Sequence, residues 1–198
     1  RQALWEMVQL NQDQPYAFTR DELVRMLDEV LGGTNRAESR TAQPSAGERD
    51  ADLHEAIMRG DLQAVQELIE GGADLNVREP SGGSSPLMTA VAFGRTEAAD
   101  ALIEAGADLN QQSNDGSTAL ITAAFFAHAG LVERLLAEGA DKSIMNTAGS
   151  TALDVVTPPF EDMRNIYDFV GSALGPYGLE LDYERIEATR PLIVEMLQ

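Results

Sequence analysis

The residues that could perform chemistry are few and scattered. The chain has two histidines, His54 and His128, and no cysteine. A general base, a metal site or a thiol nucleophile therefore has little material to draw on. The Gly-x-Ser-x-Gly and His-Glu-x-x-His motifs and the phosphate-binding loop do not occur. The stretch from Asp13 to Asp28 lacks the glycine and the ligand spacing of a calcium loop. We expect no catalysis, no bound metal and no cofactor.

Three aspartates instead recur at a regular interval. The tripeptide Gly-Ala-Asp ends at Asp74, Asp108 and Asp141, so that successive copies lie 34 and 33 residues apart. Carboxylates that converge on one point can act as an acid and a base, but carboxylates repeated along a chain mark the same place in successive structural units. Near a turn, an aspartate satisfies backbone N–H groups. We interpret these aspartates as structural.

A second series keeps step with the aspartates. Leu53, Leu87, Leu120 and Leu153 are spaced by 34, 33 and 33 residues. The last three of these leucines follow a turn that contains glycine and a small hydroxyl residue. Two series in register over about 105 residues predict a repeat protein.

Within each interval, the residue types indicate two helices and a turn. Val65, Leu68 and Ile69 stand at i, i+3 and i+4, which predicts a helix with one apolar face. Gly72 follows this helix, where a left-handed backbone requires no Cβ. Small alanines such as Ala90 allow the preceding helix to pack closely on its neighbour.

Together these features resemble the ankyrin repeat family, in which a hairpin turn and a Thr-Pro-Leu-His motif precede two antiparallel helices and a Gly-Ala-Asp-x-Asn ending. The resemblance covers Asp50 to about Val156, which is roughly three and a half repeats. It implies an all-α solenoid in which each unit buries its apolar face against the next.

This sequence departs from the family pattern at several positions. The turn histidine is replaced by Met88, Ile121 and Asp154, so the hydrogen bond typical of that side chain is lost at these turns. His128 matches a histidine at the start of the family's second helix, with Ala127 in place of the usual glycine. We expect His128 and also His54 to have structural roles.

The segments outside the repeats differ from them in composition. Thr19 and Glu22 have the spacing of a capping box before an amphipathic helix that ends at Gly32-Gly33. Pro158-Pro159 cannot continue a helix and should stop the array. Two amphipathic stretches follow, and Pro191 should kink or divide the second. The apolar stripe of the first consists of Phe160, Met163, Ile166, Tyr167, Val170 and Leu174. We therefore expect four segments: an N-terminal helical extension (1–33), a linker (34–49), ankyrin repeats (50–157) and a C-terminal helical cap (158–198).

The charge limits the classes of partner. The chain has 33 acidic and 14 basic residues, a formal net charge of -19, and most of this charge lies after residue 49. Phosphates and anionic membrane surfaces would be repelled, so we expect no nucleic-acid partner. No apolar stretch approaches the roughly 18 residues of a membrane span, so we expect no direct membrane insertion. An apolar content of 43% argues against wholesale disorder. The expected partner is a protein. The negative charge either attracts a basic partner or serves only as a solvated surface that keeps the chain soluble.

The resemblance implies which residues would contact that partner. In the family they are the hairpin tips and two variable positions on the concave face of each first helix. Carried over by register, the helix positions are Met58 and Arg59, Ala92 and Phe93, and Phe125 and Phe126; the tips are Ser81, Gly82 and Ser84, then Asn114, Asp115 and Ser117, then Thr147, Ala148 and Ser150.

The phenylalanines Phe93, Phe125 and Phe126 thus fall where solvent exposure is expected, as interface anchors do. Three alternatives remain open for these rings: cover by the chain's own N-terminal helices, contact with an external protein, or exposure without a partner.

The leading interpretation is a non-catalytic interaction protein, a subunit or adaptor of a larger assembly, that binds its partner in the concave ankyrin groove. Two alternatives remain open: a regulatory module of a larger enzyme, and an inhibitor or immunity-type protein that acts on a basic effector. Arginines outnumber the single lysine, Lys142, and alanine is abundant, which suggests a bacterial gene. The compartment, cytoplasm or periplasm, and the oligomeric state stay open. Because the chain begins at Arg1, it is either a fragment or a chain from which a leader was removed.

Overall fold

The computed structural model describes residues 46–198, with side chains from Leu53 onward. The N-terminal extension expected at residues 1–33, and most of the expected linker, lie outside the described residues. The described part belongs to one compact unit and is helical throughout its regular structure. In chain order its repeat helices are α3 (Ala46–Arg59), α4 (Leu62–Glu70), α5 (Pro86–Ala92), α6 (Thr96–Glu104), α7 (Ala119–Phe125) and α8 (Ala129–Ala137).

The helix α3 begins at Ala46, inside the segment 34–49 that the sequence predicts as a linker. The polar residues of that segment indicate exposure to solvent. A polar helix can be exposed just as a loop can, so this composition does not distinguish the two. Once a helix has formed further along the chain, each residue added at its end restricts only its own backbone. The free-energy cost of extending the helix is therefore small.

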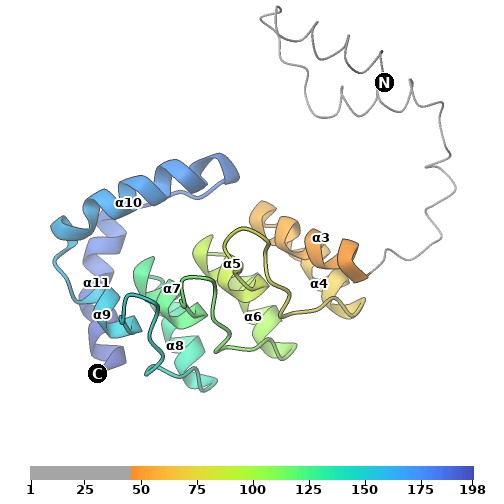
Figure 1. Cartoon of the computed structure of the whole chain (residues 1–198), viewed down its shortest axis with the longest axis horizontal. Helices are drawn as coiled ribbons and strands as arrows, with labels where there is room; N and C mark the ends of the chain where they lie inside the picture. Colours follow the sequence, from red (N-terminus) through yellow and green to blue (C-terminus); the bar gives the residue numbers. More distant parts are fainter. Residues whose placement is uncertain (1–45) are drawn as a thin grey trace, which may run out of the picture. The chain divides into compact units, whose positions relative to one another are not determined.

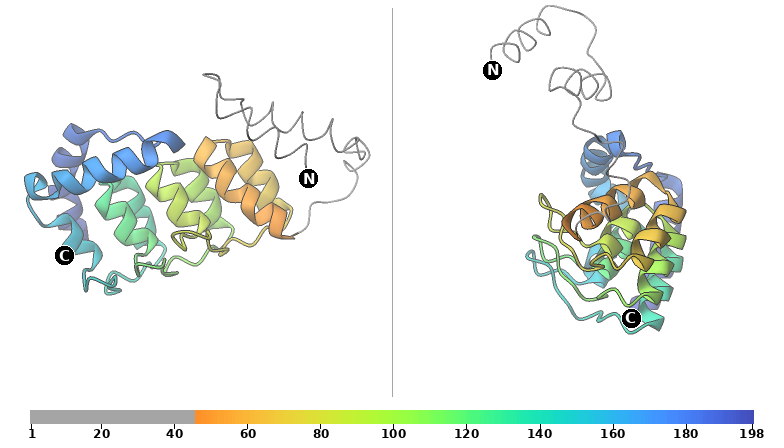
Figure 2. Two further views of the ribbon diagram at one scale, coloured as in Figure 1. Left: turned by 45° about the horizontal axis from the view of Figure 1, so that its top comes forward. Right: turned by 90° about the vertical axis from the view of Figure 1, so that its right-hand side faces the viewer.

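The helices form pairs, and the pairs stack side by side. The first helices α3, α5 and α7 pack on one another in one row, while the second helices lie behind them and the long loops project to one side (Figures 1 and 2). The arrangement confirms the all-α solenoid. We call each pair with its following loop a unit, and each projecting loop a finger.

The first helices begin at hydroxyl caps. The side chains of Ser85 and Thr118 accept hydrogen bonds from the backbone N–H groups of Met88 and Ile121, at 3.2 and 3.3 Å. The start of α9 (Ala152–Val156) has a full capping box between Thr151 and Asp154. These caps satisfy N–H groups that would otherwise have no partner at the start of a helix.

The second helices end at glycines, as the sequence predicts. Gly72, Gly106 and Gly139 have φ angles of 78, 90 and 90°. In each case the next residue, an alanine, donates its backbone N–H to the carbonyl five residues back, as in Ala73 to Leu68 at 3.0 Å. This pattern is a Schellman motif, and it requires the left-handed conformation that glycine adopts without a steric cost.

The aspartates of the Gly-Ala-Asp motif close turns and do not form an acidic site. The carboxylates of Asp74, Asp108 and Asp141 each accept from the backbone N–H two residues later, at 2.8–2.9 Å. The asparagine that follows in the first two copies reaches the next unit: Asn76 accepts from the Asp108 N–H and Asn110 from the Asp141 N–H, both at 2.8 Å. The motif therefore joins successive units.

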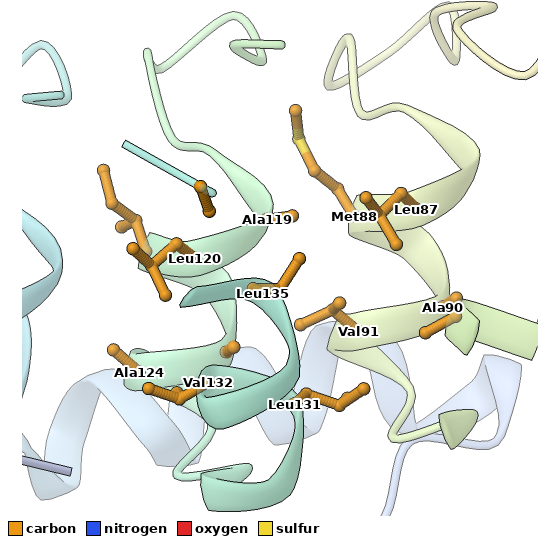
Figure 3. Close-up of a cluster of buried hydrophobic side chains, with 14 of the residues drawn as sticks. Leu87, Met88, Ala90, Val91, Ala119, Leu120, Ala124, Leu131, Val132 and Leu135 are labelled. Carbon is orange, nitrogen blue, oxygen red and sulfur yellow. The ribbon is translucent and has the colours of Figure 1, made fainter. Parts of the chain in front are cut away.

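The core lies between the two rows of helices (Figure 3). The register leucines Leu53, Leu87 and Leu120 are at most 1% exposed, and Ala90 and Ala124 are completely buried. Because an alanine occupies little volume, the first helices of neighbouring units can approach closely, and the leucines fill the space behind them.

Three further helices follow the third unit: α9, α10 (Phe160–Leu174) and α11 (Tyr183–Leu197). α9 packs against α7, as a fourth first helix would, and α11 packs against both α8 and α9 (Figure 1). α11 thus takes the place of a fourth second helix, and α10 with the short 3-10 turn η2 (Gly175–Tyr177) is inserted between them. The stacking continues past Pro158-Pro159, although the sequence periodicity stops there.

The sequence predicts that Pro191 kinks or divides the last helix, and α11 is not divided. A proline removes one helical hydrogen bond, and its cost is local. The side chains on either side of it, Ile186 and Ile193, are completely buried against the array, and their burial holds both halves in one helix.

Candidate functional site

The expected contact positions of the first helices lie at the carboxyl ends of α3, α5 and α7. Met58 and Arg59 end α3, Phe93 caps α5, and Phe125 and Phe126 end α7. The backbone turns after each end through a left-handed residue: Gly60, Gly94 and, in the third unit, Ala127, with φ angles of 74, 62 and 54°. Because the units stack, these ends lie in one row.

The carbonyl groups at each of these helix ends accept hydrogen bonds from the unit that follows. The Arg95 guanidinium donates to the Met58 carbonyl at 3.0 Å, and the His128 imidazole donates to the Ala92 carbonyl. At the third end, Arg185 of α11 donates to the Ala127 carbonyl at 2.8 Å. A donor at this end of a helix satisfies carbonyls that lack helical partners, and a cation also interacts well with the helix dipole.

His128 is held neutral by its surroundings. Burial lowers the pKa of its imidazole to about 4, and the nearby positive charge of Arg185 acts in the same direction. Its ring stacks on Phe126, with 6.1 Å between ring centroids. An imidazole with so low a pKa is a poor proton acceptor at pH 7, and its geometry fits the structural role expected of it.

His54 connects helix α3 to the finger of its own unit. Its side chain is 7% exposed, and Nε2 lies 3.1 Å from the carbonyl oxygen of Ser84, in the first finger. Among the residues that the structure describes, no group of three or more histidine or acidic side chains is arranged to hold a metal ion.

The expected exposure of the third helix end is wrong. Phe126 is only 6% exposed, and Phe125 is half-buried. The ring of Tyr167 in α10 lies 4.8 Å from that of Phe125, and the Tyr167 hydroxyl donates to the Phe125 carbonyl at 2.6 Å. The cover is therefore formed by the C-terminal helices, whereas the sequence suggests the N-terminal helices for this role.

A buried arginine anchors this cover. Arg190 in α11 is 4% exposed and donates to the Tyr167 hydroxyl at 2.9 Å and to the carbonyl of Pro158, just after α9. Tyr167 thus accepts from Arg190 while it donates to Phe125. Because a buried charge must keep its hydrogen bonds, this chain fixes α10 against α7 and α9.

The ends of the first two units are less covered. Met58 and Phe93 are half-buried, and Arg59 is exposed and ion-paired with Glu55. We call Met58, Arg59, Ala92 and Phe93 the helix-end surface. Arg59 is the one exposed residue among the expected first-helix positions of the described structure, and Phe126 is the one that is buried.

The fingers are tied to one another at their tips. The Asn114 N–H donates to the Gly82 carbonyl at 2.9 Å, and the Thr147 N–H donates to the Asp115 carbonyl at 2.8 Å. The Asn114 side chain also donates to the Ser81 carbonyl at 3.2 Å. The tips therefore form a continuous and ordered edge, with Ser81, Asn114, Asp115 and Thr147 exposed and Ser84, Ser117 and Ser150 half-buried.

Hydrogen bonds inside a finger hold Asp115 in its charged form. Burial alone would raise the pKa of its carboxyl, but hydrogen bonds from Ser113 and Ser117 outweigh this effect and lower the pKa. Glu79 in the first finger behaves alike, with Ser81 and Gly82 as donors to its carboxylate. Both fingers thus present fixed negative charges.

The positive charges of the described surface are engaged within the fold. Residues 53–198 contain 23 acidic and 8 basic side chains. Arg134, for example, lies 3.3 Å from Asp100 and 3.0 Å from Glu138. The others contact carboxylate, amide, carbonyl or aromatic groups: Arg59, Arg78, Arg95, Lys142, Arg164, Arg185 and Arg190. The charge that remains for an external partner is mainly negative.

Sequence reasoning missed one exposed feature. On α10, Ile166 is 46% exposed and Phe169 is 73% exposed. The stripe that the sequence predicts for this helix includes Ile166 among the packed residues and omits Phe169. A phenylalanine off the core period was the signal that could have revealed it.

Stacked helix pairs with projecting fingers define a helical repeat protein, a class that works by binding other molecules. A family model for ankyrin repeats matches residues 53–153 in three copies, so the chain belongs to the ankyrin repeat family. The family consists of protein–protein interaction modules and is typically non-catalytic. No curated protein matches the chain. No helix in the described part of the chain is long and apolar enough to cross a membrane.

Proposed function

We propose that this protein is a non-catalytic subunit or adaptor of a larger bacterial assembly and binds a protein partner with its helix-end surface and finger tips. One observation carries the proposal. Arg59, at the end of the first unit, is exposed and Phe93, at the end of the second, is half-buried, whereas Phe126 at the equivalent end of the third unit is only 6% exposed and its carbonyl accepts from Arg185 of α11. Met58 and Phe93 supply apolar contact area, and the finger tips supply polar groups in fixed positions.

The proposal is tested by affinity capture from the source organism with the full chain as bait, followed by mass spectrometry. The informative variants are Arg59→Glu, which changes an exposed side chain, and the double variant Met58→Ser/Phe93→Ser. Leu192→Ser, at a residue of α11 that is 47% exposed, is the matched control. We expect a captured protein to be lost with the first two and retained with the control. If no captured protein depends on these residues, the helix-end surface is not the binding site.

An inhibitor of a basic effector is a second candidate, because the basic side chains of the described surface are engaged while many carboxylates are not. A field of one sign increases the rate at which an oppositely charged partner associates, and salt screens it. We expect the association rate with the captured partner to fall at least tenfold between about 0.05 and 0.5 M salt. A rate that does not change with salt excludes this candidate and leaves the adaptor proposal intact.

A further inference from the structure

The helix α10 carries apolar side chains over more of its circumference than the array covers. Its inner side holds Phe160 and Tyr167, which are 8% and 0% exposed. At 100° per residue, Ile166, Phe169 and Ala173 lie within about 60° of one another on a different side. We call these three residues the α10 stripe. All three are exposed.

Such a stripe is unusual for a surface helix. The helices α4, α6 and α8 expose polar residues such as Gln66, Glu97 and Glu133. Phe169, by contrast, leaves 73% of its surface in water. Exposed apolar area of this kind is unfavourable in water and typically marks a surface that another molecule covers.

The spacing of the stripe fits a helix as its partner. Residues at i, i+3 and i+7 form the seam along which two helices pack, each inserting side chains between those of the other. Ala173 leaves room for a larger side chain of the partner between Phe169 and the end of α10.

Charge decides between a second copy and a different protein. Two copies would each bring a formal charge of -19, so their association through this face is opposed. The helix itself carries Glu161, Asp162 and Asp168 against one basic residue, Arg164, whose guanidinium lies 5.6 Å from the centre of the Tyr183 ring. Asp162 is exposed and falls on the side of the stripe.

We propose that the α10 stripe binds a basic amphipathic helix of a partner protein. Apolar side chains of that helix cover Ile166 and Phe169, and its lysines or arginines face Asp162. α10 is inserted between the helices of the fourth pair and shares no residue with the helix-end surface. The binding proposed for the α10 stripe and the binding proposed for the helix-end surface can therefore be tested independently.

The test uses the full chain and two synthetic helical peptides of about 18 residues. One peptide has leucines at i, i+3, i+7 and i+10 with lysines at the flanking positions, and the other has glutamates in place of the lysines. Binding is followed by fluorescence anisotropy. We expect the lysine peptide to bind at least tenfold more tightly than the glutamate peptide, and to weaken several-fold between about 0.05 and 0.3 M salt.

The variants locate the binding. Ile166→Ser/Phe169→Ser should lower the affinity for the lysine peptide at least tenfold, because two apolar anchors are removed. Met145→Ser is the matched control, at a finger residue that is 57% exposed. Its affinity for the lysine peptide should stay within twofold of that of the wild type. Asp162→Lys, which leaves the apolar residues in place, should reduce the preference for the lysine peptide. Thermal unfolding followed by circular dichroism verifies that each variant is folded.

Several results would overturn the proposal. The first is equal affinity of the lysine peptide for the wild type and for Ile166→Ser/Phe169→Ser. Equal binding of the two peptides would show that charge plays no part. The wild type could also fail to bind either peptide and sediment as a dimer. If Ile166→Ser/Phe169→Ser then sediments as a monomer, the α10 stripe is a contact between two copies of this chain.

Discussion

Acidification should destabilise this protein through His128. The folded state holds the pKa of the imidazole at about 4, while an unfolded chain has the ordinary value of 6.5. Below pH 6.5 the unfolded state takes up a proton that the folded state does not, so stability is complete above that pH and is lost as the pH falls toward 4. Between pH 7 and pH 5 this linkage amounts to about 2 kcal/mol.

The assay compares the wild type with His128→Gln, in which an amide replaces the imidazole and does not titrate. Urea unfolding at pH 7 and pH 5 gives the free energy of unfolding of both proteins. The carboxylates are common to both, so the difference between their pH dependences isolates the histidine. We expect the wild type to lose about 2 kcal/mol more than the variant over this range, which is about 4–8 °C in Tm for a domain of this size.

The reasoning also predicts a direct observation. In an NMR titration, the imidazole signal that disappears in His128→Gln should have its midpoint near pH 4. A midpoint near 6.5, or the same pH dependence of stability in both proteins, would refute the conclusion that burial and Arg185 hold this side chain neutral.

Three further changes test the contacts that hold the array together, each by urea unfolding. Tyr167→Phe should cost about 2 kcal/mol because the buried Arg190 loses one of its two acceptors and the Phe125 carbonyl loses the donor from α10; Tyr183→Phe, which loses only an exposed bond to Asp168, should cost under about 1 kcal/mol, and equal costs would contradict the anchoring role. Gly116→Ala should cost more than Gly139→Ala, since both have positive φ but only at Gly116 would the Cβ lie 2.9 Å from a neighbouring backbone atom, the nitrogen of Thr147; we expect about 1–2 kcal/mol for the strain alone, and similar losses would exclude the clash. Asn110→Ala should cost about 1 kcal/mol by removing the acceptor of the Asp141 N–H, and an unchanged stability would mean that this bond does not join the units.

Most of the repeat fold could be predicted from the sequence because its determinants are local. Thr118 caps a helix that starts one residue later, and Gly106 ends a helix by adopting a conformation that other residues avoid. The repetition of these signals at intervals of 33 and 34 residues also fixes which leucines meet in the core. The boundaries of α10 and α11 follow equally from proline, glycine and the apolar period.

The candidate site was predicted less well because its accessibility depends on residues far away in the chain. Register places Phe125 and Phe126 at variable positions of the family, but their cover comes from Tyr167, which contacts Phe125 from 42 residues further along, and from Arg185, which bonds the Phe126 carbonyl from 59 residues further along. The exposure of Phe169 also depends on the tertiary structure, because only the packing of α10 decides which side of this helix faces the array.

By itself, the sequence determined that this chain is an acidic ankyrin repeat protein, with the register of its units, the caps and glycine ends of its repeat helices and the structural character of its aspartates. Only the tertiary structure decided that α11 completes a fourth pair, that α10 closes the third helix end, and that one side of α10 remains uncovered. The physical reason is the range of the interactions. Caps, turns and apolar periods act over a few residues and are visible in the chain, whereas the docking of a non-repeating helix depends on the fit of surfaces that exist only once the units have stacked.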